Sequence, residues 1–273
     1  MKEIFQKQVE ILHHEQIGPG YFKMGLAFPE VARIARPGQF VMVRLPDWDI
    51  PLLRRPFSVH NLLFEGGDSR GFELLYKVVG QGTRGMSEKK SGEVLDVLGP
   101  LGNGFSYPDT LQHAFLVAGG VGVATLYFLG AELARKQGVQ STVFLGGCSV
   151  VDILCQDAFR DIGAEIFVTT EDCSLGEKGL VTLEVEKVLK VQRKPDVIYA
   201  CGPTAMLKAI GEIASQYEVA CQISLETVMA CGFGVCLGCA VEKVEAPGTY
   251  FHTCTDGPVF DSRLVLLDSP FSG

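Results

Sequence analysis

Four cysteines near the C-terminal end of the chain carry the most specific chemical signal in the sequence. Three of them stand in the segment CGFGVCLGC at residues 231–239, and the fourth follows after a longer gap. The spacing C-x4-C-x2-C-x14-C is typical of a plant-type [2Fe-2S] cluster, because two irons need four thiolates that converge on them. The predicted ligands are Cys231, Cys236, Cys239 and Cys254.

The glycines between these cysteines favour the same interpretation. Gly232, Gly234 and Gly238 allow the loop to wrap closely around a cluster while backbone N–H groups point at sulfur. A structural zinc ion is the alternative, but zinc sites usually combine two short cysteine knuckles and this segment offers one. Residues 221–273 show little helical periodicity, so a bound inorganic group would also supply the stability that a small apolar core cannot.

The other cysteines and the histidines are expected to be structural. Cys148, Cys155, Cys201 and Cys221 lie in or beside apolar segments, where a free thiol packs as a small hydrophobic group. Cys173 stands in a polar loop, and nothing near it indicates a nucleophile. The five histidines suit packing or surface positions better than catalysis, so we predict no catalytic acid or base.

Two short motifs in the first half of the chain could bind a pyrophosphate or an isoalloxazine ring. Residues 55–58 read Arg-Pro-Phe-Ser, and residues 80–83 read Gly-Gln-Gly-Thr. A guanidinium, hydroxyl groups and glycine backbone groups at strand ends supply the donors that phosphate needs. Taken alone, each motif is more often a surface arginine or an ordinary hairpin turn.

Two further glycine-containing motifs suggest a dinucleotide site. Residues 119–122 read Gly-Gly-Val-Gly between a strand-like and a helical segment, where a close turn lets phosphate approach a helix N-terminus. The motif is shorter than the full G-x-G-x-x-G. Residues 201–203, Cys-Gly-Pro, end a later buried segment and should lie on the same edge of a parallel sheet. Each motif therefore strengthens the other.

The elements around these motifs predict a multi-domain protein. Residues 1–105 contain short alternating apolar runs separated by Pro, Gly and Asp, which predicts an antiparallel β-barrel. Residues 106–220 alternate strand-like, glycine-rich and helical segments, which predicts a doubly wound α/β domain for nucleotide binding. Residues 221–273 are the expected small [2Fe-2S] domain.

Charge and targeting signals narrow the class of partner. The formal net charge is -8 without a Lys/Arg cluster, which argues against nucleic acid and anionic membranes. Residues 114–131 are apolar for 18 positions, but Gly-Gly-Val-Gly interrupts them, so we expect a buried strand and helix and no membrane span. The first ten residues lack the features of a secretory signal, so we expect a cytoplasmic protein without disulfides.

The order of the motifs resembles that of the ferredoxin–NADP reductase superfamily, in which a barrel holds a flavin and a second domain holds nicotinamide. With the C-terminal stretches ETVMACGFGVCLGC and TCTDGPVFD, the chain is similar over essentially its whole length to electron-transfer subunits of class B dihydroorotate dehydrogenase. Two positions depart from the superfamily pattern: Thr125 stands where proline is frequent, and Cys173 stands where glycine is common.

This resemblance implies FAD, a [2Fe-2S] cluster and NAD as cofactors, and it implies their sites. The implied FAD site consists of Arg55, Pro56, Phe57, Ser58, Leu75, Tyr76, Lys77, Gly82 and Thr83. The implied nicotinamide site consists of Gly119, Gly120, Val121, Gly122, Cys201, Gly202 and Pro203. The sequence does not indicate which residue would distinguish NAD from NADP.

The resemblance also implies a partner and a reaction in pyrimidine biosynthesis. A separate FMN-containing catalytic subunit would oxidise dihydroorotate, and electrons would pass through [2Fe-2S] and FAD to NAD+ in a heterotetramer. The chain itself would then have no dihydroorotate site. The alternative is a flavin and iron–sulfur NAD(P)H reductase subunit of another oxidoreductase, such as a glutamate-synthase-like or sulfide dehydrogenase protein. A nucleotide-binding regulatory protein with a zinc domain is the alternative from another class.

Overall fold

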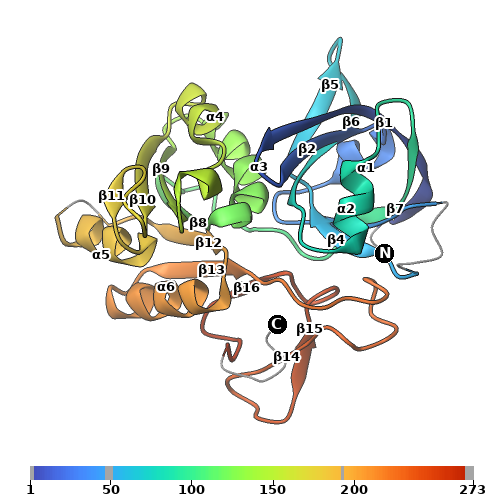
Figure 1. The fold of residues 1–273 in the computed structure, drawn as a ribbon. Helices are drawn as coiled ribbons and strands as arrows, with labels where there is room; N and C mark the ends of the chain where they lie inside the picture. Colours follow the sequence, from blue (N-terminus) through green and yellow to red (C-terminus); the bar gives the residue numbers. More distant parts are fainter. Residues whose placement is uncertain (1–2, 47–51, 192–193, 268–273) are drawn as a thin grey trace.

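The N-terminal part of the chain forms one curled antiparallel sheet. The computed structural model describes residues 3–46, 52–191 and 194–267 (Figure 1). The strand order is β4-β3-β7-β1-β2-β6-β5. The strands are β1 (Phe5–Gly18), β2 (Tyr21–Leu26), β3 (Phe40–Arg44), β4 (Arg55–Ser58), β5 (Asn61–Glu65), β6 (Asp68–Lys77) and β7 (Val94–Leu101), and the short helices are α1 (Pro29–Ile34) and α2 (Gln81–Ser87).

The curl brings β4, at one edge of the sheet, against β6, which lies next to the opposite edge. Phe57 on β4 contacts Tyr76 on β6 edge to face, with ring centroids 5.8 Å apart. The predicted antiparallel β-barrel is therefore confirmed in the form of a curled sheet, with β4 and β5 as its outer strands.

Strand β3 is buried on both faces because its side chains alternate between two cores. Val41 and Val43 belong to the apolar core inside the curled sheet. Phe40 and Met42 point the other way and pack with Cys239 and residues near it. One strand thus joins the barrel core to the cysteine segment.

The second part of the chain is an α/β domain with a mainly parallel sheet, as predicted. Its strand order is β11-β10-β9-β8-β12-β13-β16. The strands are β8 (His113–Gly119), β9 (Gln140–Gly147), β10 (Glu165–Thr170), β11 (Glu177–Lys178), β12 (Val197–Cys201), β13 (Ala220–Ser224) and β16 (Val259–Asp261). The helices are α3 (Val123–Ala134), α4 (Gln156–Asp161), α5 (Val181–Val191) and α6 (Thr204–Gln216), with 3-10 turns η1 (Gly120–Gly122) and η2 (Val150–Asp152).

The apolar stretch at residues 114–131 is divided as expected between β8, η1 and α3. Because the chain runs from β8 to β9 on one side and later places β12 on the other, the strand order reverses at β8. Ligands of doubly wound sheets bind at such a reversal. A search of the described helices found none with the length and hydropathy of a membrane span.

The C-terminal part leaves the sheet and then returns to it. Strands β14 (Ala240–Glu242) and β15 (Tyr250–His252) form a small antiparallel pair. Strand β16 then pairs antiparallel with β13, so the cysteine segment lies between two neighbouring strands of the α/β sheet. The expected domain boundary at residue 220 falls on the first residue of β13.

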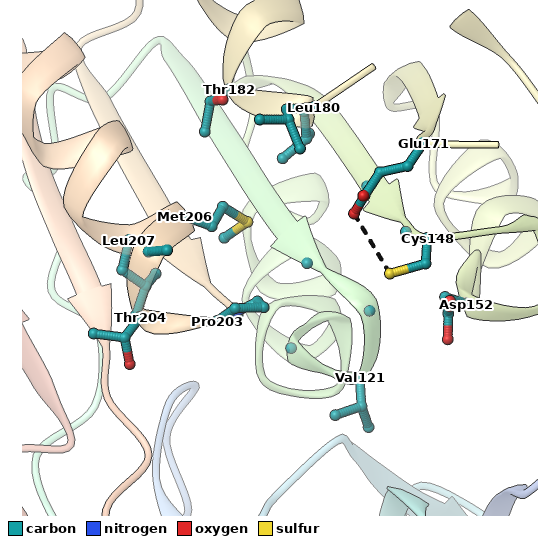
Figure 2. A pocket seen from close by; sticks show the side chains of 18 of the residues that line it. Val121, Cys148, Asp152, Glu171, Leu180, Thr182, Pro203, Thr204, Met206 and Leu207 are labelled. Carbon is teal, nitrogen blue, oxygen red and sulfur yellow. Dashed lines mark hydrogen bonds between the residues drawn. The ribbon is translucent and has the colours of Figure 1, made fainter. Parts of the chain in front are cut away.

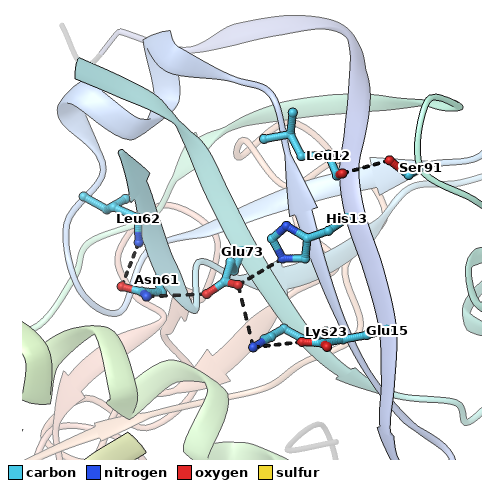
Figure 3. A network of polar contacts seen from close by, with 8 residues as sticks. All are labelled: Leu12, His13, Glu15, Lys23, Asn61, Leu62, Glu73 and Ser91. Atoms are coloured by element: carbon cyan, nitrogen blue, oxygen red, sulfur yellow. Dashed lines mark hydrogen bonds and ion pairs between the residues drawn. The ribbon is translucent and has the colours of Figure 1, made fainter. Parts of the chain in front are cut away.

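A buried carboxylate fixes the half of the curled sheet that faces the α/β domain. Figure 3 shows Glu73 on β6 surrounded by side chains from three other strands. His13 Nε2 lies 3.1 Å and Asn61 Nδ2 lies 3.4 Å from its carboxylate, and Lys23 Nζ lies 3.9 Å away. These partners compensate the cost of burying the charge and hold β1, β2, β5 and β6 in register.

A histidine connects the curled sheet to helix α3. His60 follows β4, is almost fully buried, and its Nδ1 lies 2.9 Å from the carbonyl oxygen of Ala124, to which it donates. Burial lowers the pKa of His60, because desolvation of the imidazolium outweighs the favourable hydrogen bond. The imidazole is therefore neutral in the folded protein at neutral pH.

We expect His60 to make the protein sensitive to mild acid. Below about pH 6.5 the imidazole of His60 binds a proton in the unfolded chain but not in the folded protein. The free energy of unfolding therefore falls as pH falls. The variant His60→Gln should be less stable at pH 7.5 but should lose less stability between pH 6.5 and 5, by up to about 1.4 kcal/mol per pH unit. Urea unfolding at several pH values measures this difference. Equal pH slopes in both proteins would contradict the assignment.

Candidate functional site

A first pocket opens between the curled sheet, the start of α3 and the segment that leads to the cysteines. Its volume is about 600 Å³. All nine residues predicted for FAD line it, namely Arg55, Pro56, Phe57, Ser58, Leu75, Tyr76, Lys77, Gly82 and Thr83. The structure therefore brings together two motifs that are separated by more than twenty positions in the sequence.

Hydrogen bonds hold the walls of this pocket in place. The Oγ1 of Thr83 accepts from the backbone N–H groups of Val79 and Gly80 at 2.9 and 3.1 Å, which fixes the turn before α2. The hydroxyl of Tyr76 lies 3.0 Å from Nε2 of His14. Burial raises the pKa of Tyr76, so the phenol stays protonated and its ring is a fixed apolar wall.

A second pocket, of about 610 Å³, lies over the carboxyl ends of the parallel strands (Figure 2). Of the seven residues predicted for nicotinamide, six line it: Gly119, Gly120, Val121, Gly122, Gly202 and Pro203. The seventh, Cys201, is fully buried beneath the pocket, and burial raises the pKa of its thiol to about 12. The turn after β8 and the turn after β12 thus form one side of the pocket.

These two turns approach so closely that only glycine fits at residue 122. A Cβ atom on Gly122 would lie 2.3 Å from the carbonyl oxygen of Cys201, which is backbone and cannot rotate away. A Cβ on Gly119 would lie 2.7 Å from the ring of Pro203. The Gly-Gly-Val-Gly motif is therefore explained by the contact between β8 and β12 as well as by ligand approach.

The two pockets meet at shared residues. Lys77, Val121, Leu225 and Glu226 line both of them. Although Glu226 reaches solvent through the open pockets, the protein around it raises the pKa of its carboxyl group by desolvation. Glu226 is the first residue of the stretch ETVMACGFGVCLGC, but neither Glu226 nor Leu225 was predicted to line a ligand site, because both follow a strand whose place appears only in the folded sheet.

A row of small polar groups runs beneath this junction. Thr125 donates its hydroxyl proton to Oγ of Ser58 at 2.7 Å, and Sγ of Cys201 lies 3.6 Å from Oγ1 of Thr125. The row connects β4, α3 and β12. Thr125, where the resemblance led us to expect proline, therefore contributes a hydrogen bond between the two domains.

The four predicted metal ligands lie on one segment in two close pairs. Sγ of Cys239 and Sγ of Cys254 are 3.3 Å apart and both are buried. Cys231 Sγ accepts backbone N–H groups from Phe233 and Cys236, each at 3.5 Å. Burial opposes ionisation, but these N–H groups prevail and lower the pKa of Cys231 to about 6.

The loop geometry fits thiolate binding. Gly232 and Gly234 have φ values of 84° and 88°, which L residues rarely adopt, and Leu237 also has a positive φ of 58°. Four thiols with N–H donors directed at sulfur are the donor set that a [2Fe-2S] cluster requires. Within the described part of the chain, no three His, Cys, Asp or Glu side chains are close enough to hold a single metal ion.

Family models match both functional regions of the chain. Residues 226–266 match the iron–sulfur cluster binding domain of dihydroorotate dehydrogenase B. Residues 116–212 match the oxidoreductase NAD-binding domain. The first region contains all four predicted ligands, and the second begins in β8 and includes both glycine turns.

Curated relatives are similar over nearly the full chain. The dihydroorotate dehydrogenase B (NAD(+)) electron transfer subunit of Desulforamulus reducens is 39% identical and covers 98% of this chain and 100% of its own. The subunit of the same name from Caldanaerobacter subterraneus is 38% identical and covers 96% of this chain and 99% of its own.

Solved structures share the fold. A structure of an NADH-dependent reduced ferredoxin–NADP oxidoreductase, concerned with flavin-based electron bifurcation, has a TM-score of 0.83 and 34% identity over 95% of this chain and 90% of that one. The ferredoxin reductase of a carbazole 1,9a-dioxygenase has a TM-score of 0.65 at 19% identity, covering 79% of this chain and 67% of that one.

A curled antiparallel sheet beside a nucleotide-binding α/β domain, with a cysteine segment for iron and sulfur, defines an oxidoreductase of the ferredoxin reductase type. These findings support FAD, NAD and [2Fe-2S] as its cofactors. The chain belongs to the family of electron transfer subunits of dihydroorotate dehydrogenase B (NAD(+)).

The close contact at Gly122 gives a direct test of the second pocket. The variant Gly122→Ala should push the turn after β8 away from the turn after β12, at a stability cost of about 1–3 kcal/mol. We expect the KM for NADH to rise about tenfold or more in dye reduction, because the pocket wall moves. Gly138→Ala is the control for lost stability without movement of the turn, because its positive φ strains an alanine although no neighbouring atom obstructs the added Cβ. Equal KM values in the two variants would contradict the role of the contact.

Proposed function

We propose that this chain passes electrons from an FMN-containing dihydroorotate dehydrogenase subunit to NAD+. In this proposal FAD occupies the first pocket, NAD the second, and a [2Fe-2S] cluster the cysteine segment. The single observation that carries it is the continuity of the three sites. Phe40 and Met229 line the first pocket and also pack in one apolar cluster with Cys239 and Cys254, while Glu226 lines both pockets.

The proposed roles of the residues follow from this arrangement. Arg55, Ser58 and the turn at Thr83 would bind and orient FAD, and the turns at Gly122 and Gly202 would receive the nucleotide phosphates. The four cysteines would hold the cluster. Bound FAD would supply the junction between two-electron hydride chemistry and the one-electron chemistry of the cluster.

We further propose that the chain has no dihydroorotate site of its own and works in the cytoplasm. Oxidation of dihydroorotate would take place on the partner, and the assembly would be a heterotetramer of two chains of each kind. The division into functional units at residues 1–105, 106–220 and 221–273 belongs to the same proposal. What supports a partner is the name of the relatives, which are electron transfer subunits.

A second candidate is a flavin and iron–sulfur NAD(P)H reductase subunit of another oxidoreductase. The observation in its favour is the similarity to the NADH-dependent reduced ferredoxin–NADP oxidoreductase at 34% identity and a TM-score of 0.83. The curated relatives match at 36–39% identity and share one name, which favours dihydroorotate as the electron source.

The native complex distinguishes these candidates. We expect the chain, purified anaerobically with its co-purifying subunit, to reduce NAD+ when dihydroorotate is added. Removal of the partner should abolish this activity while NADH oxidation by ferricyanide persists. A complex that contains flavin and iron but does not reduce NAD+ with dihydroorotate would favour the second candidate.

Replacement of one predicted ligand tests the cysteine segment separately. Cys236→Ser should lose the visible absorbance and the iron of the cluster and should abolish dihydroorotate-dependent NAD+ reduction. NADH oxidation by ferricyanide should be retained, because the two pockets do not include Cys236. Cys173→Ser, another exposed thiol, is the matched control and should keep its iron. Unchanged iron in Cys236→Ser would contradict the ligand assignment, and zinc in place of iron in the wild-type protein would indicate a structural zinc site.

A further inference from the structure

Thr125 is held at the boundary between the two domains by its neighbours on helix α3. It lies in the first turn of α3, which runs between the parallel sheet and the curled sheet (Figure 1), and its side chain is almost fully buried. The carbonyl oxygen of the preceding residue, Ala124, accepts from His60 Nδ1 at 2.9 Å. Phe128, one turn further along the same face of α3, packs into the apolar core inside the curled sheet. These two contacts fix the position of Thr125 relative to the curled sheet.

The hydroxyl of Thr125 connects two groups that come from different strands. It donates its proton to Oγ of Ser58, on β4, at 2.7 Å. Its oxygen lies 3.6 Å from Sγ of Cys201, on β12, which donates to it. A threonine hydroxyl has one proton to donate and an oxygen that can accept. Thr125 thus accepts on one side and donates on the other, so the row of hydrogen bonds has a direction, from β12 to β4.

The thiol of Cys201 favours this direction. Burial raises the pKa of Cys201 to about 12, so the thiol keeps its proton at neutral pH and is a weak donor. Because Oγ1 of Thr125 accepts from this thiol, the single proton of Thr125 is directed away from Cys201 and toward Ser58.

Ser58 is the end of the row that reaches the first pocket. Its side chain is half-buried and lines this pocket together with Arg55 and Thr83. Because Ser58 Oγ accepts the proton of Thr125, its own proton is directed elsewhere. Among the described residues, none accepts this proton within hydrogen-bond distance. The remaining direction is the pocket, where bound FAD would present the nitrogen and carbonyl acceptors of its ring.

The residue type at position 125 makes this arrangement possible. Proline, which the resemblance led us to expect there, is tolerated in the first turn of a helix but has no hydroxyl group. Without a donor beside it, the hydroxyl of Ser58 could rotate among three staggered positions. Threonine restricts that rotation, and the branched Cβ of Thr125 restricts the rotation of its own side chain as well.

We propose that Thr125 is a positioning residue for flavin binding, which fixes the hydroxyl of Ser58 as a hydrogen-bond donor to FAD. The inference rests on the proposed FAD site in the first pocket. Thr125 also lines that pocket, but its one proton is used by Ser58, so it acts through Ser58. The α/β domain would thereby contribute to the binding of a flavin that lies mainly against the curled sheet.

The test measures the dissociation constant of FAD from the full chain with its iron–sulfur cluster. The holoprotein is diluted, and the FAD released at equilibrium is measured by its fluorescence. Ser58→Ala removes the donor and should raise the dissociation constant about 5- to 10-fold, the effect of one ordinary hydrogen bond. Thr125→Val keeps nearly the same shape but leaves the Ser58 hydroxyl free to rotate and less polarised. It should raise the dissociation constant about threefold.

Two further variants show whether Thr125 acts through Ser58. Thr125→Ser keeps the hydroxyl group and should return the dissociation constant to within about 1.5-fold of the wild type. In the double variant Ser58→Ala/Thr125→Val, the second substitution should add less than about 1.5-fold to the first, because no hydroxyl is left to orient.

Thr169→Val is the matched control for the loss of a buried threonine hydroxyl. Thr169 lies on β10 of the same domain, is buried, and its Oγ1 has no hydrogen-bond partner among the described residues. It lines neither pocket. Its dissociation constant for FAD should therefore equal that of the wild type.

Four results would overturn the proposal. If Ser58→Ala weakens FAD binding but Thr125→Val does not, the first pocket remains the FAD site and the role of Thr125 is wrong. If Thr125→Val has its full effect in the Ser58→Ala background, Thr125 contributes by packing alone. An equal loss in Thr169→Val would assign the effect to general stability. If Ser58→Ala binds FAD as the wild type does, the placement of FAD against Ser58 is itself contradicted, and this inference with it.

Discussion

The position of the cysteine segment depends on the burial of strand β3 on both faces. Val41 and Val43 fill the interior of the curled sheet, and Met42 and Phe40 pack against Cys239 and its neighbours. Because side chains alternate along a strand, a shift of one residue would exchange the two sets of side chains between the two faces of β3. The packing of both cores would then be disrupted. The register of one five-residue strand therefore determines where the iron–sulfur segment lies relative to the first pocket.

A second constraint is the set of polar contacts that joins the curled sheet to the α/β domain beside the two pockets. Ser58 comes from the curled sheet, Thr125 from α3 and Cys201 from β12, and the three are linked by short polar contacts. The two domains therefore do not simply lie side by side. Their pockets share a wall, so a flavin and a nicotinamide bound in them would be neighbours without any large rearrangement of the chain.

Most of the residues that sequence motifs identified lie in the walls of the two pockets. The motifs at residues 55–58 and 119–122 and the cysteine spacing are local, because each depends on turn chemistry or ligand count within a few positions. The places of Glu226 and Glu171 in the pocket wall depend on strand order, which a linear pattern does not contain. Cys201 shows the converse, since its motif lies at the pocket edge but its own side chain points into the core.

The return of β16 to the edge of the α/β sheet makes the cysteine segment an insertion between two adjacent strands and not a tail. Both ends of the insertion, after Ser224 and before Val259, are anchored in the same sheet edge. Because both ends are anchored, the segment cannot move as a domain on a flexible linker would. Electron transfer to the flavin would therefore not require such a domain movement.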